Sequence, residues 1–176
     1  MLVCTEKEDG SVNMAPVSFF MDASFQPPML AFAMGRAVCS GENLRRTGRA
    51  VLAAPGVSLE KAVIACGSAS GRGTDKMKET PVPLQRLEEE GVPFPEDSRV
   101  SFAVSLERTV EAGDHYLHLC RIARMAGDEN REALYAWDGY AAAAPAARKE
   151  TRYDSSLPQQ PVIWFSNAPR PKRSPA

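Results

Sequence analysis

"RVSFAVSLERTV", residues 99–110, is the stretch that decides the fold class. Large apolar residues stand at the even positions from 100 to 106, and small residues stand between them. This alternation, with a period of two, predicts a half-buried strand of an antiparallel sheet. The turn sequence "EAGDH" (111–115) follows, and "YLHLCRIARM" (116–125) predicts a second long strand. The two strands therefore form one long hairpin.

Shorter predicted strands lie on both sides of this hairpin. They are expected on both sides of the Asp9–Gly10 turn within 1–21, at 27–34 and 49–54, and in a closing hairpin formed by 132–137 and 140–144. An Asp-Gly pair is the strongest short signal for a hairpin turn. Because tight turns join most neighbouring strands, the sequence favours a mostly β antiparallel barrel over a parallel, doubly wound sheet.

A few helices are predicted between the strands. Ser40 is a suitable N-cap for a helix over 40–48, and Gly48 is a suitable end for it. Apolar residues on one face predict a second helix over 58–67. A polar helix is expected at 84–91. The fold class is thus β with a few helices.

Composition indicates one domain of ordinary globular character. The chain has 176 residues, of which 44% are hydrophobic and 24% charged, close to the average of soluble proteins. The net charge of −1 gives no electrostatic footprint for nucleic acid. No apolar run is long enough to span a membrane and no signal peptide is recognisable, so we expect a cytoplasmic protein.

The amino-acid composition changes near the C-terminus. We expect residues 1–147 to form the domain and 148–176 to form a tail rich in alanine, proline and charge. Within this tail "PVIWFSN" (161–167) is apolar enough to dock, either on its own barrel or on a twin subunit. The four cysteines contain no Cys-x-x-Cys pair and the chain has two histidines, so we expect buried thiols and no metal site.

"CGSASGRGTDKM", residues 66–77, has the composition of a loop that approaches an anion. Its glycines remove the Cβ obstacle, its hydroxyls and amides donate hydrogen bonds, and Arg72 and Lys76 supply positive charge. The spacing fits neither a P-loop nor a Rossmann fingerprint, because Lys76 does not follow a glycine and no third glycine stands where a helix would open. A flexible surface loop remains the alternative.

Four stretches together resemble the flavin reductase-like, FMN-binding split-barrel family, which includes flavoredoxin. They are "DGSVNMAPVSFFMDASFQPPMLAFAMG" (9–35), "SGENLRRTGRAVLAAPG" (40–56), "CGSASGRGTDKM" (66–77) and "EAGDHYLHLCRI" (111–122). The resemblance covers residues 1 to about 147, with the blocks in the family's order. It implies an antiparallel split β-barrel that binds FMN in a groove between the two barrels of a homodimer.

The resemblance also implies a set of flavin contacts along one strand. The edge of the isoalloxazine ring is best recognised by strand backbone that is not paired elsewhere, and Pro16 interrupts pairing because it has no N–H. We therefore expect Asn13, Ala15, Pro16, Val17 and Ser18 to lie along the ring. An ordinary edge strand without a ligand is the alternative for this segment.

A phosphate site is expected at the start of the helix over 40–48. Ser40 offers a hydroxyl at the positive end of the helix dipole, and Asn43 lies on the same turn. Family members usually carry an arginine where this chain has Val38, so Arg36 is the nearest substitute cation. Ser40 would otherwise serve only as a helix cap.

Three further residues are expected near the nucleotides. Arg72 and Lys76 would reach the flavin phosphate or the incoming nicotinamide nucleotide. Asp75 would instead cap a short helix and leave Lys76 as a solvated surface charge. His115, on a turn that the family directs to the dimer groove, would lie near the flavin or nicotinamide, or would serve only to bond the hairpin, whereas His118 is expected to be structural.

The resemblance implies an oxidoreductase that passes electrons from NAD(P)H through FMN to an acceptor that is unknown. The alternative is an FMN-carrying electron-transfer or flavin-binding module without nicotinamide-dependent activity. Neither needs an acid or base from a side chain, because the chemistry belongs to the cofactor. We also expect a homodimer, because the apolar faces of 100–106 and 117–122 exceed what one small barrel with few helices would cover.

Overall fold

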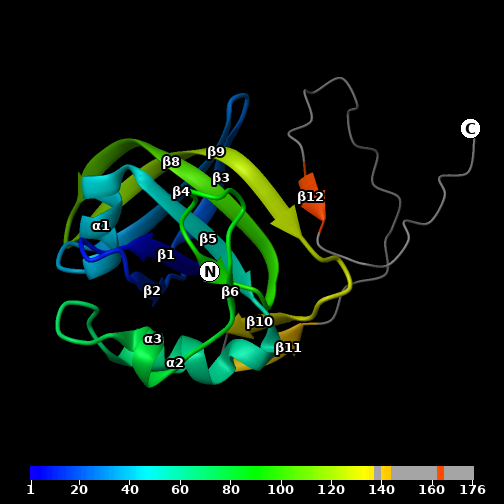
Figure 1. Cartoon of the computed structure of the whole chain (residues 1–176). Coiled ribbons are helices and arrows are strands. Elements are labelled where there is room, and N and C mark those ends of the chain that lie inside the picture. The colour runs from blue at the N-terminus through cyan, green and yellow to red at the C-terminus, as the bar shows by residue number, and fades with distance from the viewer. Residues whose placement is uncertain (137–139, 144–161, 165–176) are drawn as a thin grey trace, which may run out of the picture.

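A curved antiparallel sheet forms the body of the protein in the computed structural model, which describes residues 1–136, 140–143 and 162–164 (Figure 1). Its strands are β1 (Leu2–Glu6), β2 (Val12–Pro16), β3 (Phe20–Phe25), β4 (Pro28–Gly35), β5 (Arg49–Pro55), β8 (Ser98–Ala112), β9 (His115–Gly127) and β12 (Val162–Trp164). They pair in the order β2-β1-β5-β8-β9-β4-β3, and β12 pairs in parallel with β9. The predicted mostly β antiparallel fold is confirmed.

β8 and β9 form the long hairpin that the alternation predicts. Gly113 has φ 61°, the left-handed conformation that the tight turn needs. Phe102 and Val104 of β8 pack in one hydrophobic cluster, and Ala103 faces another. The two faces of the strand therefore serve two cores. None of the large apolar side chains in 100–106 and 117–122 is exposed, so these faces do not provide the uncovered surface that we expected.

The two edges of the sheet lie close together. β2 ends at Pro16 and β3 begins at Phe20, so residues 17–19 join one edge of the sheet to the other. Such a link spans at most about 14 Å. The sheet is therefore curved into an incompletely closed barrel. The hairpin predicted around the Asp9–Gly10 turn is confirmed by β1 and β2, and the chain leaves β2 after Pro16, which cannot donate a ladder hydrogen bond.

α1 (Cys39–Thr47) and α2 (Glu60–Ser68) confirm two of the predicted helices. Gly48 ends α1 with φ 71°. The prediction that Ser40 caps α1 is wrong: the helix begins one residue earlier, and Val38 stands at the N-cap position without a side-chain hydrogen bond. A single turn of 3-10 helix, η1 (Val57–Leu59), precedes α2.

The polar helix expected at 84–91 is wrong. This segment contains β6 (Leu84–Gln85), which pairs with β7 (Phe94–Pro95). The backbone N–H of Glu96 donates to the carbonyl oxygen of Pro83 at 2.9 Å and extends the pairing. Leu84 packs against a core cluster that contains the fully buried Phe94. Tertiary contacts and backbone pairing therefore override the helix propensity of the glutamates.

Two hydrophobic clusters lie on opposite faces of the sheet. β1 shows this directly, because Leu2 and Cys4 belong to one cluster and Val3 to the other. The first cluster also contains Val63 and Cys66 of α2, whereas the second contains Leu44 of α1. Figure 1 shows α1 at one end of the sheet and α2 together with α3 (Lys76–Glu79) below it. The two helices thus cover different parts of the barrel.

The closing hairpin is confirmed by β10 (Ala133–Ala136) and β11 (Tyr140–Ala143), which pair with each other, while its Asp138–Gly139 turn lies outside the described residues. Three residues of the apolar segment 161–167 form β12, and the remainder of the tail lies outside the described residues. Cys4, Cys66 and Cys120 are buried and Cys39 is half-buried, all as free thiols. Within the described ranges we find neither a cluster of metal ligands nor a helix able to span a membrane.

Candidate functional site

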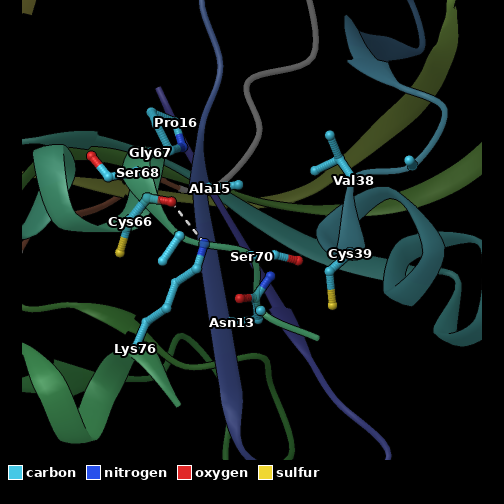
Figure 2. Close-up of a pocket in the computed structure, with 13 residues that line it drawn as sticks. Asn13, Ala15, Pro16, Val38, Cys39, Cys66, Gly67, Ser68, Ser70 and Lys76 are labelled. Carbon is cyan, nitrogen blue, oxygen red and sulfur yellow. Dashed lines mark hydrogen bonds between the residues drawn. The ribbon is translucent and has the colours of Figure 1, made fainter. Parts of the chain in front are cut away.

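A cavity of about 430 Å³ lies beside the edge strand β2. Its lining comes from Asn13, Ala15 and Pro16 of β2, from 37–39 at the start of α1, from the segment 66–71, and from Lys76. Figure 2 shows Val38 and Cys39 on one side of β2, and Gly67 and Ser68 on the other. The cavity thus brings together three of the stretches that carry the predicted site, and its volume lies in the range of small-molecule pockets.

A buried hydrogen-bond network links Asn13 to α1. The side-chain Nδ2 of Asn13 donates to Oγ of Ser40 at 2.7 Å. Asn43 donates from Nδ2 to Oγ1 of Thr5 at 3.2 Å, and that hydroxyl donates to the backbone oxygen of Asn13 at 3.4 Å. All four residues are buried. Three predicted site residues therefore lie together, as one polar layer between β1, β2 and α1.

Within this layer only Asn13 reaches the cavity. Ser40 and Asn43 do not line it, and their side-chain polar atoms bond to Asn13 and Thr5. They hold Asn13 in place. The Oδ1 atom of Asn13 is buried without a hydrogen-bond partner in the described part of the chain. An acceptor of this kind is costly when it stays unpaired, so it fits a ligand that brings an N–H donor.

Two glycines allow the 66–71 segment to approach β2 closely. A Cβ placed on Gly71 would overlap Oδ1 of Asn13, an approach that real Cβ atoms do not make. A Cβ on Gly67 would lie 3.1 Å from Cγ of Pro16. Gly73, by contrast, has open space around it. The first two glycines of the stretch therefore have a packing role at the cavity, and the third does not.

Lys76 carries the charge of the cavity. Only 5% of the residue is exposed, and its Nζ donates to the carbonyl oxygen of Met14 at 2.9 Å. Nζ also donates to the carbonyl oxygen of Cys66 at 2.7 Å (Figure 2). Burial lowers the pKa of this ammonium from its ordinary value. Asp75 does cap α3, accepting from the N–H groups of Met77 and Lys78, as one alternative predicted. The solvated Lys76 that went with that alternative is wrong, because the side chain turns inward.

The other predicted cations stand at the surface beside carboxylates. Arg36 pairs with Glu111 at 3.1 Å, and both are exposed. Arg72 pairs with Glu42. Neither arginine lines the cavity, and Lys76 is the one charged residue in the described lining.

His115 lies at the hairpin turn, where its Nδ1 is 2.7 Å from Oδ1 of Asp114 and its ring contacts Phe19. It does not line the cavity. His118 is fully buried, as expected for a structural residue, with Nδ1 3.1 Å from Oγ1 of Thr109. The turn histidine is thus the more accessible of the two.

Val17 and Ser18 continue from β2 but leave the cavity. The N–H of Val17 donates to the backbone oxygen of Met1 at 2.8 Å, and its carbonyl oxygen accepts from the amino group of Met1 at 3.0 Å. The backbone of Val17 is therefore already paired. Sequence reasoning missed Cys39 and the half-buried Ala69 as lining residues, although both adjoin positions that it singled out.

A sequence model described as "Flavin reductase like domain" matches residues 1–144. The chain belongs to this family. A curated relative, an uncharacterized protein of Archaeoglobus fulgidus, is 26% identical over 110 residues. That match spans 62% of this chain and 62% of the relative's length.

Solved structures of related proteins share the fold. An FMN-binding protein from Thermus thermophilus, crystallised with 1-cyclohex-2-enone, has a TM-score of 0.71 and 22% identity, over 84% of this chain and 87% of its own. Flavoredoxin from Methanosarcina acetivorans has a TM-score of 0.71 and 18% identity, with coverage of 89% and 90%. An NADH:FAD oxidoreductase of Streptomyces globisporus C-1027 has a TM-score of 0.67 and 19% identity, with coverage of 76% and 77%.

The residues of the cavity fit a flavin nucleotide. A planar, mostly apolar ring needs apolar walls, which Ala15, Pro16 and Val38 supply. The unpaired Oδ1 of Asn13 suits an N–H of the ring system, and Lys76 suits a ligand with negative charge. The cavity thus offers a hydrogen-bond acceptor, a cation and the glycine backbone at 67 and 71. It agrees with the family assignment, which rests on the sequence match.

Proposed function

We propose that this protein binds FMN and acts as a flavin reductase or flavoredoxin-like oxidoreductase that passes electrons from NAD(P)H through the flavin to an acceptor. One observation carries the proposal beyond the family assignment. A cavity beside an unpaired sheet edge is lined by Lys76, whose buried ammonium no carboxylate neutralises within the described lining, and by Asn13, whose buried amide oxygen has no partner among the described residues. This combination suits an anionic ligand with hydrogen-bonding edges.

The proposed ring contacts are the cavity-lining residues of β2. Asn13, Ala15 and Pro16 lie on a strand that pairs with β1 on one side only. Its other side is therefore open to a ligand. Val17 and Ser18 would contact the ring only beyond the cavity. The backbone N–H and carbonyl oxygen of Val17 are already hydrogen-bonded to Met1.

Ser40 and Asn43 are proposed to act through Asn13. Ser40 accepts from the side-chain amide of Asn13, and Asn43 is linked through the hydroxyl of Thr5 to the backbone oxygen of Asn13. A phosphate role for either residue stays a prediction, and it would require rearrangement of this buried network.

Arg36, Arg72 and His115 are proposed to serve the nicotinamide nucleotide or the flavin phosphate from outside the cavity. Both arginines are exposed and are paired with carboxylates that are themselves exposed or half-buried. Ion pairs of this kind contribute little and exchange readily for another anion. A phosphate could therefore replace Glu111 or Glu42 as the partner.

When bound, FMN would supply the redox chemistry, taking two electrons and a proton from the nicotinamide and passing electrons onward. The chain's own residues orient the ring, exclude water from one of its faces and supply a fixed positive charge. Ala15 and the apolar part of Pro16 form the dry wall. No side-chain acid or base is needed for this scheme.

We further propose a homodimer in the cytoplasm, with 1–147 as the domain and 148–176 as an arm. The surface that supports the dimer is the edge strand β3 and the residues before it. Phe19, Phe20, Met21 and Phe25 are exposed there, with Phe25 at 83%. Exposed apolar patches on an unpaired edge are typical of protein interfaces.

Anaerobic mixing of the FMN-loaded protein with NADH or NADPH tests the proposed activity. We expect the flavin absorbance near 450 nm, a region where only oxidised flavin absorbs strongly, to bleach with at least one of the two nucleotides. The control is chemical reduction of the same sample with dithionite, which shows that the bound flavin is reducible. Bleaching with dithionite alone would overturn the nicotinamide-dependent activity and favour the electron-transfer module.

A further inference from the structure

Lys76 is a buried cation that the proposed binding roles do not fully explain. Its Nζ lies within hydrogen-bond distance of two carbonyl oxygens, one on β2 and one in the last turn of α2. The Cys66 carbonyl is among the last four of the helix, which have no partner within it. Because the carboxyl end of a helix carries partial negative charge, it stabilises an ammonium there. The site is built to hold a positive charge.

That charge has no counterion in the described part of the chain. Among the described residues Nζ bonds only to the two carbonyl oxygens, and the described lining of the cavity contains neither aspartate nor glutamate. A lysine ammonium has three N–H donors, and two are used by Met14 and Cys66. One N–H donor thus remains for a ligand in the cavity, and the positive charge is not neutralised by a carboxylate of the described lining.

We infer that Lys76 makes the cavity bind reduced flavin more tightly than oxidised flavin, and so raises the reduction potential of the bound cofactor. This inference rests on the proposed function. The charge lies at the carbonyl of Met14, on the same strand whose neighbouring residues Asn13 and Ala15 are proposed to face the ring. It is therefore close to the part of the ligand whose charge changes, rather than at the exposed rim.

The charge balance of the reaction gives the direction of the effect. A hydride from a nicotinamide carries two electrons and one proton, so its transfer leaves the nicotinamide as a cation and adds one negative charge to the flavin. The phosphate of FMN has the same charge before and after. A fixed cation near the ring thus favours the reduced ligand, whereas a cation at the phosphate favours both forms equally.

The first measurement uses the unmodified protein. Its dissociation constants for oxidised and for dithionite-reduced flavin are determined by anaerobic calorimetry at pH 7.5, with FMN and with riboflavin. We expect reduced flavin to bind at least about tenfold tighter, the size of effect that one charge exerts over several ångströms in a protein interior. A tenfold ratio corresponds to about 30 mV for a two-electron couple. Riboflavin should show the same ratio, because the phosphate is not involved.

The second measurement removes the charge. Lys76→Met should bring the ratio of the two dissociation constants close to one. Lys78→Met is the matched control: it removes the same charge from the same short helix, but that side chain is 84% exposed and pairs with Asp75. The control should keep the parent's ratio. If Lys76→Met does not fold, as judged by circular dichroism, Lys76→Gln keeps an N–H donor without the charge.

Each result has a distinct meaning. Equal binding of oxidised and reduced flavin by the unmodified protein would overturn this inference and leave the proposed function intact. An equal loss of affinity for both redox forms in Lys76→Met would also overturn it, and would assign Lys76 to the phosphate or to positioning β2. Failure of the unmodified protein to bind any flavin would overturn the proposed function, and this inference with it.

Discussion

Asn13 donates from Nδ2 to Oγ of Ser40 across 2.7 Å, in a buried layer between β2 and α1. The two residues are 27 positions apart in sequence. The other atom of the same amide, Oδ1, has no partner among the described residues and lies against Gly71. Ser40 does not line the cavity, but its hydrogen bond holds the side chain of Asn13, which does. Ser40 acts on a ligand through Asn13.

Replacing Ser40 with alanine should lower both the free energy of unfolding and the affinity for flavin. The loss of a buried hydrogen bond that leaves an amide unpaired costs about 1–3 kcal/mol. Because Ser40 acts through the ring-facing Asn13, FMN and riboflavin should be weakened by the same factor, about tenfold for 1.4 kcal/mol. Titrations with both ligands measure this.

Ser105→Ala, on β8 outside the cavity, is the control for this variant and should leave both affinities unchanged. A loss confined to FMN would contradict the account of Ser40. It would show that the hydroxyl contacts the phosphate, as the sequence pattern suggests.

Gly71→Ala should weaken flavin binding, whereas Gly73→Ala should not. A methyl group on Gly71 would overlap Oδ1 of Asn13, so the loop or the amide must move. Overpacking of this kind typically costs about 1–3 kcal/mol, and we expect the dissociation constant for FMN to rise about tenfold. Gly73 lies in the same loop with no atom within 4 Å of the added carbon. Similar affinities for the two variants would mean that the loop does not form the cavity wall.

The long hairpin could be predicted because large apolar and small residues alternate in the sequence of 100–106, a pattern typical of a half-buried strand. The shorter strands were predicted from apolar runs bounded by turn residues, and most of them are buried on both faces rather than alternating. The segment 84–91 was predicted wrongly because its glutamates favour a helix, while Leu84 and Leu87 must reach a core built by distant residues. Local propensity carries no information about such contacts.

The site could be predicted only as a set of stretches. The glycine-rich segment was found from its composition and Asn13 from the family resemblance, and the fold brings them together. The direction of the Lys76 side chain was not predictable, because its partners, the carbonyls of Met14 and Cys66, are 62 and 10 positions away. Ser40 has the residue type of a helix cap, yet α1 begins before it and buries its hydroxyl.

The stability of the protein should fall as the pH decreases from about 6.5 to about 4, in part because of His118. Burial lowers the pKa of this imidazole from 6.5 to about 4. Between these values the unfolded chain binds a proton that the folded chain does not, so unfolding is favoured by about 1.4 kcal/mol per pH unit. Over the whole interval the loss is about 3 kcal/mol. Urea titrations at pH 7, 6 and 5 measure it.

Carboxylates also titrate in this range, so the test is a comparison of variants. His118→Gln removes this contribution and should show a shallower pH dependence than the parent. Identical slopes in the His118 variant and the parent would show that His118 does not titrate upon unfolding.

The protein should be a homodimer that depends on the edge beside β3. Phe19 is 62% exposed and Phe25 is 83% exposed. Light scattering should give twice the mass of one chain, and Phe19→Ser combined with Phe25→Ser should shift the protein toward the monomer. Ile64→Ser is the control, since it removes an exposed apolar side chain, 46% exposed, from α2. A parent protein that binds FMN as a monomer would contradict the proposed interface.

The central claim is that the cavity beside β2 binds FMN, and the visible spectrum of the protein tests it most directly. The protein is equilibrated with excess FMN, free flavin is removed by gel filtration, and the absorbance at 450 nm is compared with the protein concentration. We predict one FMN per chain for the parent and for Gly73→Ala, and a clearly lower occupancy for Gly71→Ala. A colourless parent protein, together with unquenched flavin fluorescence in direct titration, would contradict the account.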